Sequence, residues 1–194
     1  MASEPEKGMR KPRADVVRNR ERLLAAAVDV FRCGGSAASL EAVARGAGVG
    51  IGTLYRHFPT REALFEAVYR REVEELARLA ERLSEGPDPV EALRQWSRGG
   101  IQLVATKHGM LTALALAVDK SSDVYAFSFE HLTRAIGLLL GKAVTAGQIR
   151  HDVAPEDVLH ALVGMSMMGK GPGWEANVMR LLDIFIDGLL KRPA

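Results

Sequence analysis

With 194 residues, 47% of them hydrophobic, the chain is long enough to bury a sizeable core, and this composition excludes wholesale disorder. No apolar run approaches the length of a membrane span and the single cysteine cannot form an internal disulfide, so we expect a cytoplasmic protein without membrane partners. The net charge is only +2, but residues 1–60 carry ten basic and six acidic side chains, an excess typical of a segment that meets phosphate.

The chain is predicted to begin with a flexible basic arm over residues 1–14, which are polar and contain two prolines. A first helix is expected from an N-cap at Asp15 to the glycine pair Gly34-Gly35. Its apolar residues recur on one helical face. They are Val16, Leu23, Ala27, Val30 and Phe31.

Two short helices separated by a glycine turn are expected next. Ser39 is a suitable N-cap for the first, and Gly48-Val49-Gly50 ends it with a tight turn. The second is expected over residues 51–58, with Leu54 and Phe58 pointing inward. This spacing predicts a helix-turn-helix, whose second helix reads the major groove of DNA. A plain helical hairpin within a bundle is the alternative interpretation of the same spacing.

The remaining chain is predicted to be helical, and the fold class all-α, because no alternation of apolar and polar residues is sustained. The helix over 122–147 is apolar on almost all sides, so we expect it in the middle of a bundle. The other helices are expected over 61–83, 89–107, 110–118, from 155 onward and over 174–190.

The segment 39–64, SLEAVARGAGVGIGTLYRHFPTREAL, resembles the DNA-binding head of the TetR family of bacterial regulators almost position by position. Together with the first helix, the resemblance covers about residues 20–70. It implies a helix-turn-helix DNA-binding domain over 15–62 and an effector-binding and dimerisation domain over 63–194. The runs that carry it are Gly48-Val49, Gly52-Thr53-Leu54-Tyr55, His57-Phe58-Pro59 and Glu62-Ala63-Leu64.

The resemblance implies DNA contacts on the exposed face of the helix at 51–58. Hydroxyl groups there can bond phosphates, and Arg56 can read a guanine edge. Two positions depart from the family pattern: Gly50 replaces a common serine N-cap, and Ile51, often polar or basic, could contact a thymine methyl or pack inward. The expected contacts are Ser39, Ile51, Gly52, Thr53, Tyr55, Arg56, His57 and Arg61, with Lys11 and Arg13 of the arm adding salt-dependent affinity.

An effector pocket and a dimer surface are expected in the second domain. An apolar cavity with a few polar groups is predicted at Trp96, Leu103, Leu114, Phe127, His131 and Met165. Ordinary core packing is the alternative, and for His131 a core histidine bonded to a carbonyl. Pairing of the last two helices with a second copy would bury wide apolar stripes at Val158, Leu162, Val178, Leu182, Phe185 and Leu189.

We expect a homodimer that binds an inverted-repeat operator in double-stranded DNA. The resemblance implies a repressor that a small-molecule effector releases, with activation as the alternative. The five histidines lack metal-ligand spacing and no phosphate loop or nucleophile motif is present, so no enzyme activity, metal or cofactor is expected. The alternative is a helical ligand-binding or scaffolding protein without DNA readout, whose association would not weaken steeply with salt.

Overall fold

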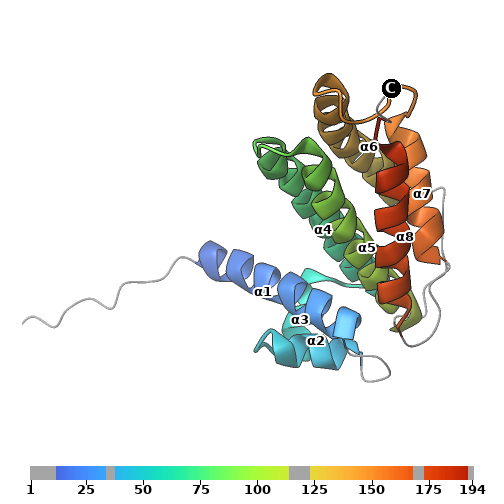
Figure 1. Ribbon diagram of the computed structural model, residues 1–194. Helices are drawn as coiled ribbons and strands as arrows, with labels where there is room; N and C mark the ends of the chain where they lie inside the picture. The colour runs from blue at the N-terminus through green and yellow to red at the C-terminus, as the bar shows by residue number, and fades with distance from the viewer. Residues whose placement is uncertain (1–11, 34–37, 114–122, 168–172, 192–194) are drawn as a thin grey trace, which may run out of the picture.

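The computed structural model describes residues 12–33, 38–113, 123–167 and 173–191. In these ranges the chain forms helices and no strand, which confirms the predicted all-α class (Figure 1). An isolated antiparallel bridge joins Ile149 to Leu190. The helices are α1 (Pro12–Cys33), α2 (Leu40–Gly46), α3 (Ile51–His57), α4 (Arg61–Ser84), α5 (Pro89–Ala113), α6 (Asp123–Thr145), α7 (Pro155–Met167) and α8 (Trp174–Leu189).

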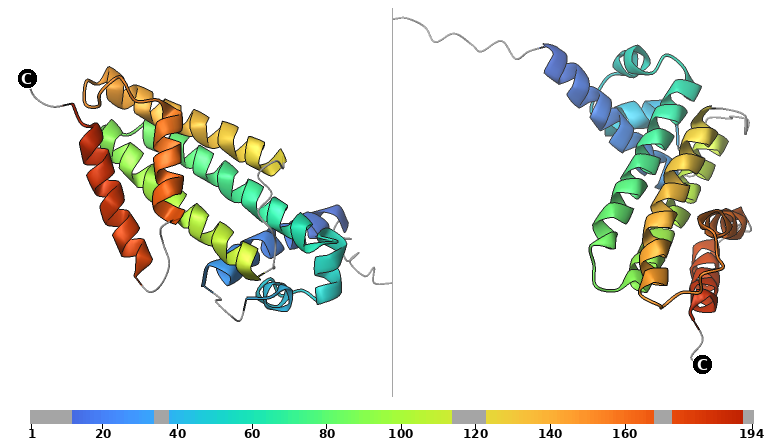
Figure 2. Two further views of the ribbon diagram at one scale, coloured as in Figure 1. Left: turned by 90° about the vertical axis from the view of Figure 1, so that its right-hand side faces the viewer. Right: turned by 90° about the horizontal axis from the view of Figure 1, so that it is seen from above.

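The helices form a small head and a larger bundle, each around its own buried core. Helices α1, α2 and α3 lie together at one end of the molecule, and α4 to α8 run alongside one another above them (Figures 1 and 2). The head core includes Leu54 and Phe58, whereas the bundle core includes Trp96 and Ile136. The cores meet inside α4, where Val68 belongs to the head core and the next residue, Tyr69, to the bundle core.

Side-chain caps explain where several helices begin. The Ser39 hydroxyl oxygen accepts a hydrogen bond of 3.1 Å from the Ala42 amide, and Thr60 caps α4 through Ala63 in the same way. Asp88 accepts from two amides at the start of α5. These bonds satisfy N–H groups that have no partner inside a helix. They confirm the cap predicted at Ser39 and the helix starts predicted at residues 61 and 89.

Helix α1 begins earlier than predicted. It starts at Pro12, a residue suited to the first helical position, so Asp15 lies inside the first turn and does not cap the helix. Three residues assigned to the arm therefore lie in the helix, including Arg13, whereas Lys11 lies outside the described residues. The placement of Val16 on the apolar face was also wrong, since this side chain is 55% exposed.

Two predictions for the bundle need correction. Helix α5 runs on to Ala113 and does not break near residue 108, because a single glycine within a helix costs only about 1 kcal/mol. The remainder of the helix predicted over 110–118 lies outside the described residues. Helix α6 packs against α4, α5 and α7, yet Phe129 and Leu138 are exposed, so it is not covered on every side.

The head and the bundle are joined by polar and apolar contacts at the end of α1. The Arg32 guanidinium donates to Thr106 Oγ1 of α5 at 3.2 Å and lies 3.3 Å from a carboxylate oxygen of Glu72 on α4. Burial raises the pKa of Glu72, and the Arg32 charge opposes that shift. Met110 of α5 packs into the head core. A displacement of α4 or α5 would therefore change the position of α1 directly.

None of the helices in the described ranges is both long and apolar enough to cross a membrane.

Candidate nucleic-acid interface

The turn between α2 and α3 holds the two short helices at a fixed angle. Gly48 has a φ of +63°, a left-handed conformation that glycine adopts without steric cost. After it, the Val49 amide donates back to the Ala44 carbonyl at 3.0 Å. Leu54 and Phe58 are buried against α1 and α2 in the head core and anchor α3 from beneath. The opposite face of α3 is therefore presented outward on a rigid support.

The outward face of α3 carries the side chains predicted to meet DNA. Ile51 is 38% exposed and Tyr55 is 45% exposed, so Ile51 points outward and does not pack into the core. Arg56 and Gly52 are exposed, and no atom lies within 4 Å of the position that a Gly52 Cβ would occupy. A nucleic-acid backbone can approach this glycine closely. Thr53 and His57 are half-buried at the edges of the same face.

Two arginines lie near Glu41 of α2, one at the start of α4 and one in the last turn of α2. Exposed Arg61 is the first residue of α4. The pKa of Glu41 lies below its ordinary value because its carboxylate accepts from its own backbone N–H and from the Ser39 hydroxyl, with Arg61 and Arg45 adding positive charge nearby. Arg45 is exposed and was not among the predicted contacts. The sequence feature that could have identified Arg45 is its position one helical turn after Glu41.

Replacing Gly48 by alanine is expected to lower the free energy of unfolding by about 1–2 kcal/mol, because φ is positive there. An added Cβ would also lie 2.5 Å from an Arg22 guanidinium nitrogen, so that side chain must move. Urea denaturation at a fixed protein concentration measures the loss.

Gly50→Ser is the matched control for this prediction. Gly50 is the N-cap of α3 with φ at −74°, and no atom lies within 4 Å of an added Cβ. Serine there should be neutral or stabilise by a few tenths of a kcal/mol. Equal stability losses at both glycines would contradict the assigned turn geometry.

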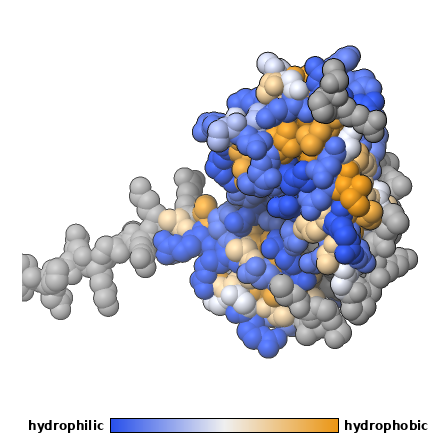
Figure 3. All heavy atoms as spheres, viewed as in Figure 1, coloured by the Kyte–Doolittle hydropathy of each residue, from blue (hydrophilic) through white to orange (hydrophobic). Residues whose placement is uncertain are grey.

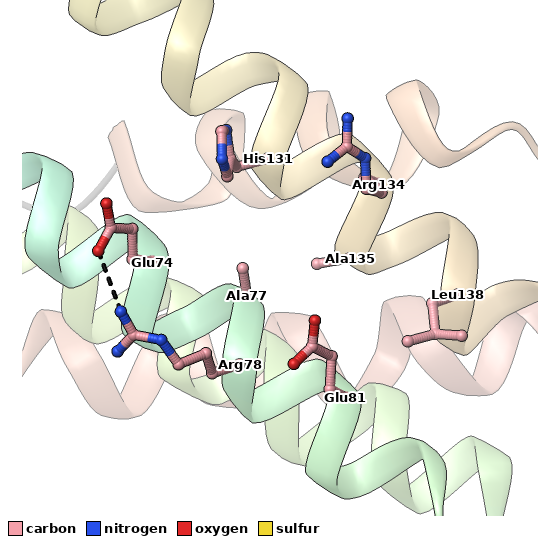
Figure 4. A pocket seen from close by; sticks show the side chains of 8 residues that line it. All are labelled: Glu74, Ala77, Arg78, Glu81, His131, Arg134, Ala135 and Leu138. Atoms are coloured by element: carbon pink, nitrogen blue, oxygen red, sulfur yellow. Dashed lines mark hydrogen bonds and ion pairs between the residues drawn. The ribbon is translucent and has the colours of Figure 1, made fainter.

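The residues predicted to form one pocket do not share one environment. Trp96 and Leu103 are buried in the bundle core, and the Trp96 indole N–H donates to the Leu76 carbonyl at 2.8 Å. Half-buried Met165 packs against this core, and Leu114 lies outside the described residues. The rings of Phe127 and His131 lie 4.0 Å apart. Of the members of the predicted set that the structure describes, only His131 lines the cleft between α4 and α6 drawn in Figure 4.

The residues predicted for the dimer surface face into their own chain. Those of α7 pack in the bundle core, as do Val178, Leu182 and Leu189 of α8, while Phe185 is half-buried against it. Other positions of α7 and α8 expose apolar surface, and in Figure 3 apolar side chains gather on the face where α8 lies. The exposed apolar residues on and next to these two helices are Val163, Met167, Leu181, Ile184 and Leu190.

The described residues contain no group of three or more histidine, cysteine, aspartate or glutamate side chains arranged to hold a metal ion.

Comparison with known proteins assigns both parts of the chain. Residues 23–68 match the family described as bacterial regulatory proteins, tetR family. Residues 88–191 match the family described as the C-terminal domain of SbtR-like transcriptional regulators. A curated relative, the HTH-type transcriptional regulator SAR0097 of Staphylococcus aureus, is 31% identical over 106 residues, which are 53% of this chain. The match spans about half of that relative, 52% of its length.

Two solved structures resemble about nine tenths of the chain. The TetR transcriptional regulator SCO0520 from Streptomyces coelicolor is 44% identical, with a TM-score of 0.77 and coverage of 90% of this chain and 99% of that one. A TetR transcription regulatory protein from Mycobacterium vanbaalenii is 32% identical, with a TM-score of 0.69 and coverage of 92% and 99%. The similarity therefore extends through head and bundle alike.

Proposed function

Because this chain belongs to the TetR family of DNA-binding transcriptional regulators, we propose that it is a homodimeric cytoplasmic repressor, which binds an inverted-repeat operator and leaves it when a small-molecule effector binds. The resemblance predicted from residues 20–70 is thus confirmed at the level of the family. The proposal rests on the outward face of α3, which exposes polar side chains. Leu54 and Phe58 on the opposite face of this helix are buried in the head core.

The side chains of α3 are suited to distinct parts of a DNA duplex. Tyr55 and Thr53 carry hydroxyl groups that bond phosphate oxygens, which positions the helix without reading sequence. Arg56 has the forked donor that matches a guanine edge in the major groove, and exposed Ile51 matches a thymine methyl. Arg61 adds a phosphate contact at the start of α4. We assign no catalytic role to these residues.

Two copies of the chain are proposed to pair through the outer faces of α7 and α8. Ile184 is 64% exposed, and Leu181 lies one turn before it on the same side of α8. Val163 and Met167 are spaced likewise on α7, with exposed Gly164 allowing close approach. A twofold axis through this surface would bury these side chains in a four-helix interface and present two copies of α3 to DNA.

Replacing Ile184 by glutamate is expected to convert the dimer to monomers at micromolar concentration, because the interface would bury a charge without a partner. Light scattering coupled to size-exclusion chromatography measures the change in mass. Val17→Glu on α1 is the matched control, since Val17 is 62% exposed but lies outside the proposed interface. A dimeric Ile184→Glu protein would rule out this surface.

Effector release is proposed to act through α4. This helix contributes to both cores, and α1 contacts both α4 and α5 through Arg32. A ligand that binds the bundle better in one position of α4 than in another would change the separation of the two heads. A preference of a few kcal/mol between the two positions is sufficient to release DNA.

The experiment that tests the function is selection of genomic DNA fragments by the purified protein at two salt concentrations. A DNA-binding regulator should retain particular fragments, with an affinity that falls steeply as salt rises because bound arginines displace counterions. The alternative, a scaffolding or ligand-carrying protein, would retain none selectively. That second result would contradict the proposal.

A further inference from the structure

The bundle contains a cleft of about 490 Å³ between α4 and α6. Figure 4 shows Ala77 of α4 and Ala135 of α6 facing each other across it, where short side chains leave the space between the helices unfilled. Leu138 extends the apolar wall toward one end, near Glu81, while Glu74 and His131 lie toward the other. A compact organic molecule would find an apolar floor with polar groups at both ends.

The cationic side chains of this cleft are already paired with acids. The Arg78 guanidinium donates to Glu74 at 3.0 Å and to Glu75 at 2.7 Å, and Arg134 donates to Glu130 at 2.7 Å. Glu75 and Glu130 do not line the cleft. The lining itself has two acids and two arginines, and because both arginines are paired with Glu74, Glu75 and Glu130, Glu81 is the lining acid left without a cation in the described part of the chain.

Two acceptors of the cleft are left without a cationic partner, one on Glu81 and one on His131. Among the described residues, the structure gives the Glu81 carboxylate no ion pair and no side-chain hydrogen bond. The Nδ1 of His131 lies 2.9 Å from the Phe127 carbonyl oxygen, so this nitrogen carries the proton in the neutral ring. Nε2 of His131 is then an acceptor as well. A ligand that donates hydrogen bonds and carries positive charge complements this set.

We propose that the α4–α6 cleft binds an organic amine with an apolar body, its ammonium group beside Glu81 and its hydrocarbon part against Ala77, Ala135 and Leu138. This inference rests on the proposed function, in which a small molecule acts on the bundle.

Two residues that line the α4–α6 cleft also lie close to the head. Glu74 and Arg78 also line a second cleft between α1 and α4, together with Glu21 and Arg71. There, Arg71 lies 3.2 Å from the Glu21 carboxylate and so ties α4 to α1. Arg78 lines both clefts and lies on α4 between Glu81 and this contact, so a ligand beside Glu81 would act on the helix that holds α1. The proposal therefore links occupancy of the α4–α6 cleft to the position of α1 through α4.

Isothermal titration of the full-length protein with three probes on one skeleton tests the site: 4-phenylbutylamine, 4-phenylbutanol and 4-phenylbutyrate. The amine should bind at least tenfold more tightly than the other two. Glu81→Gln should weaken amine binding about fivefold, because it removes an exposed charge partner. Glu175→Gln, an exposed acid at the start of α8, is the matched control and should bind the amine unchanged.

Three outcomes would overturn the site: no saturable binding of the amine, equal or tighter binding of the alcohol or carboxylate, or an unchanged affinity in Glu81→Gln. Affinity for a selected DNA fragment, measured with and without amine, separates the two proposals. Amine binding that depends on Glu81 but leaves DNA affinity unchanged supports the site and contradicts ligand-controlled release by it. If the protein without any ligand binds no DNA fragment selectively, the proposed function is contradicted. The titration result then still decides whether the cleft binds the amine.

Discussion

Trp96→Ala is expected to lower the free energy of unfolding by about 3–5 kcal/mol, the range measured when a large aromatic side chain is deleted from a core. Trp96 is 1% exposed, and its indole N–H donates to the Leu76 carbonyl across the α4–α5 contact. The substitution leaves a void and removes the indole donor from the Leu76 carbonyl, which keeps only its backbone partner within α4. Urea denaturation followed by circular dichroism, at one protein concentration, measures the change.

Trp96→Phe separates the two contributions to this loss. Phenylalanine keeps much of the ring volume but cannot donate to Leu76, so a smaller loss of about 1–2 kcal/mol is expected. If Trp96→Ala lowered the free energy of unfolding by less than about 1 kcal/mol, Trp96 would border an open space. It would then again be a candidate residue of the effector pocket. The structure predicts the larger loss because the ring is enclosed by the bundle core.

Joint replacement of Tyr55 and His57 by alanine is expected to weaken binding to a selected DNA fragment about 100-fold or more. Each side chain can supply a hydrogen bond to a charged phosphate, worth about 1.5–3 kcal/mol, and a dimer carries each twice. The fold should be retained, since Tyr55 is exposed and His57 half-buried. Fluorescence anisotropy measures the affinity, and thermal melting checks that the head remains folded.

His151→Ala is the control for this variant. His151 is exposed in the connection between α6 and α7, in the bundle, so its loss should leave DNA affinity unchanged. A double variant that binds DNA as tightly as the parent would show that α3 does not contact DNA through this face.

The head could be predicted from sequence because its determinants are local. Ser39 and Thr60 cap helices through residues three positions later, and Gly48 is required by its own backbone conformation. Leu54 and Phe58 lie one turn apart, so their shared inward direction follows from helical spacing. The start of α1 was less predictable, since Pro12 and Asp15 both suit a first turn.

The bundle was harder to predict because its contacts depend on how distant helices are rotated and aligned. On α7, Leu162 is buried and its neighbour Val163 is exposed. The sequence shows that both are apolar but not which one faces the chain's own core. The α4–α6 cleft arises where Ala77 faces Ala135. The sequence of either helix alone does not show that these two alanines face each other. His131 was singled out for the pocket, but the acids opposite it were not.

Footprinting of the protein on a selected DNA fragment tests the central claim most directly, namely that two copies of α3 read a twofold-symmetric operator. The structure predicts protection of two half-sites of inverted sequence, centred a whole number of helical turns apart, with protection lost in the Tyr55 and His57 double variant. Protection of a single unrepeated stretch, or protection that survives the double variant, would contradict the claim.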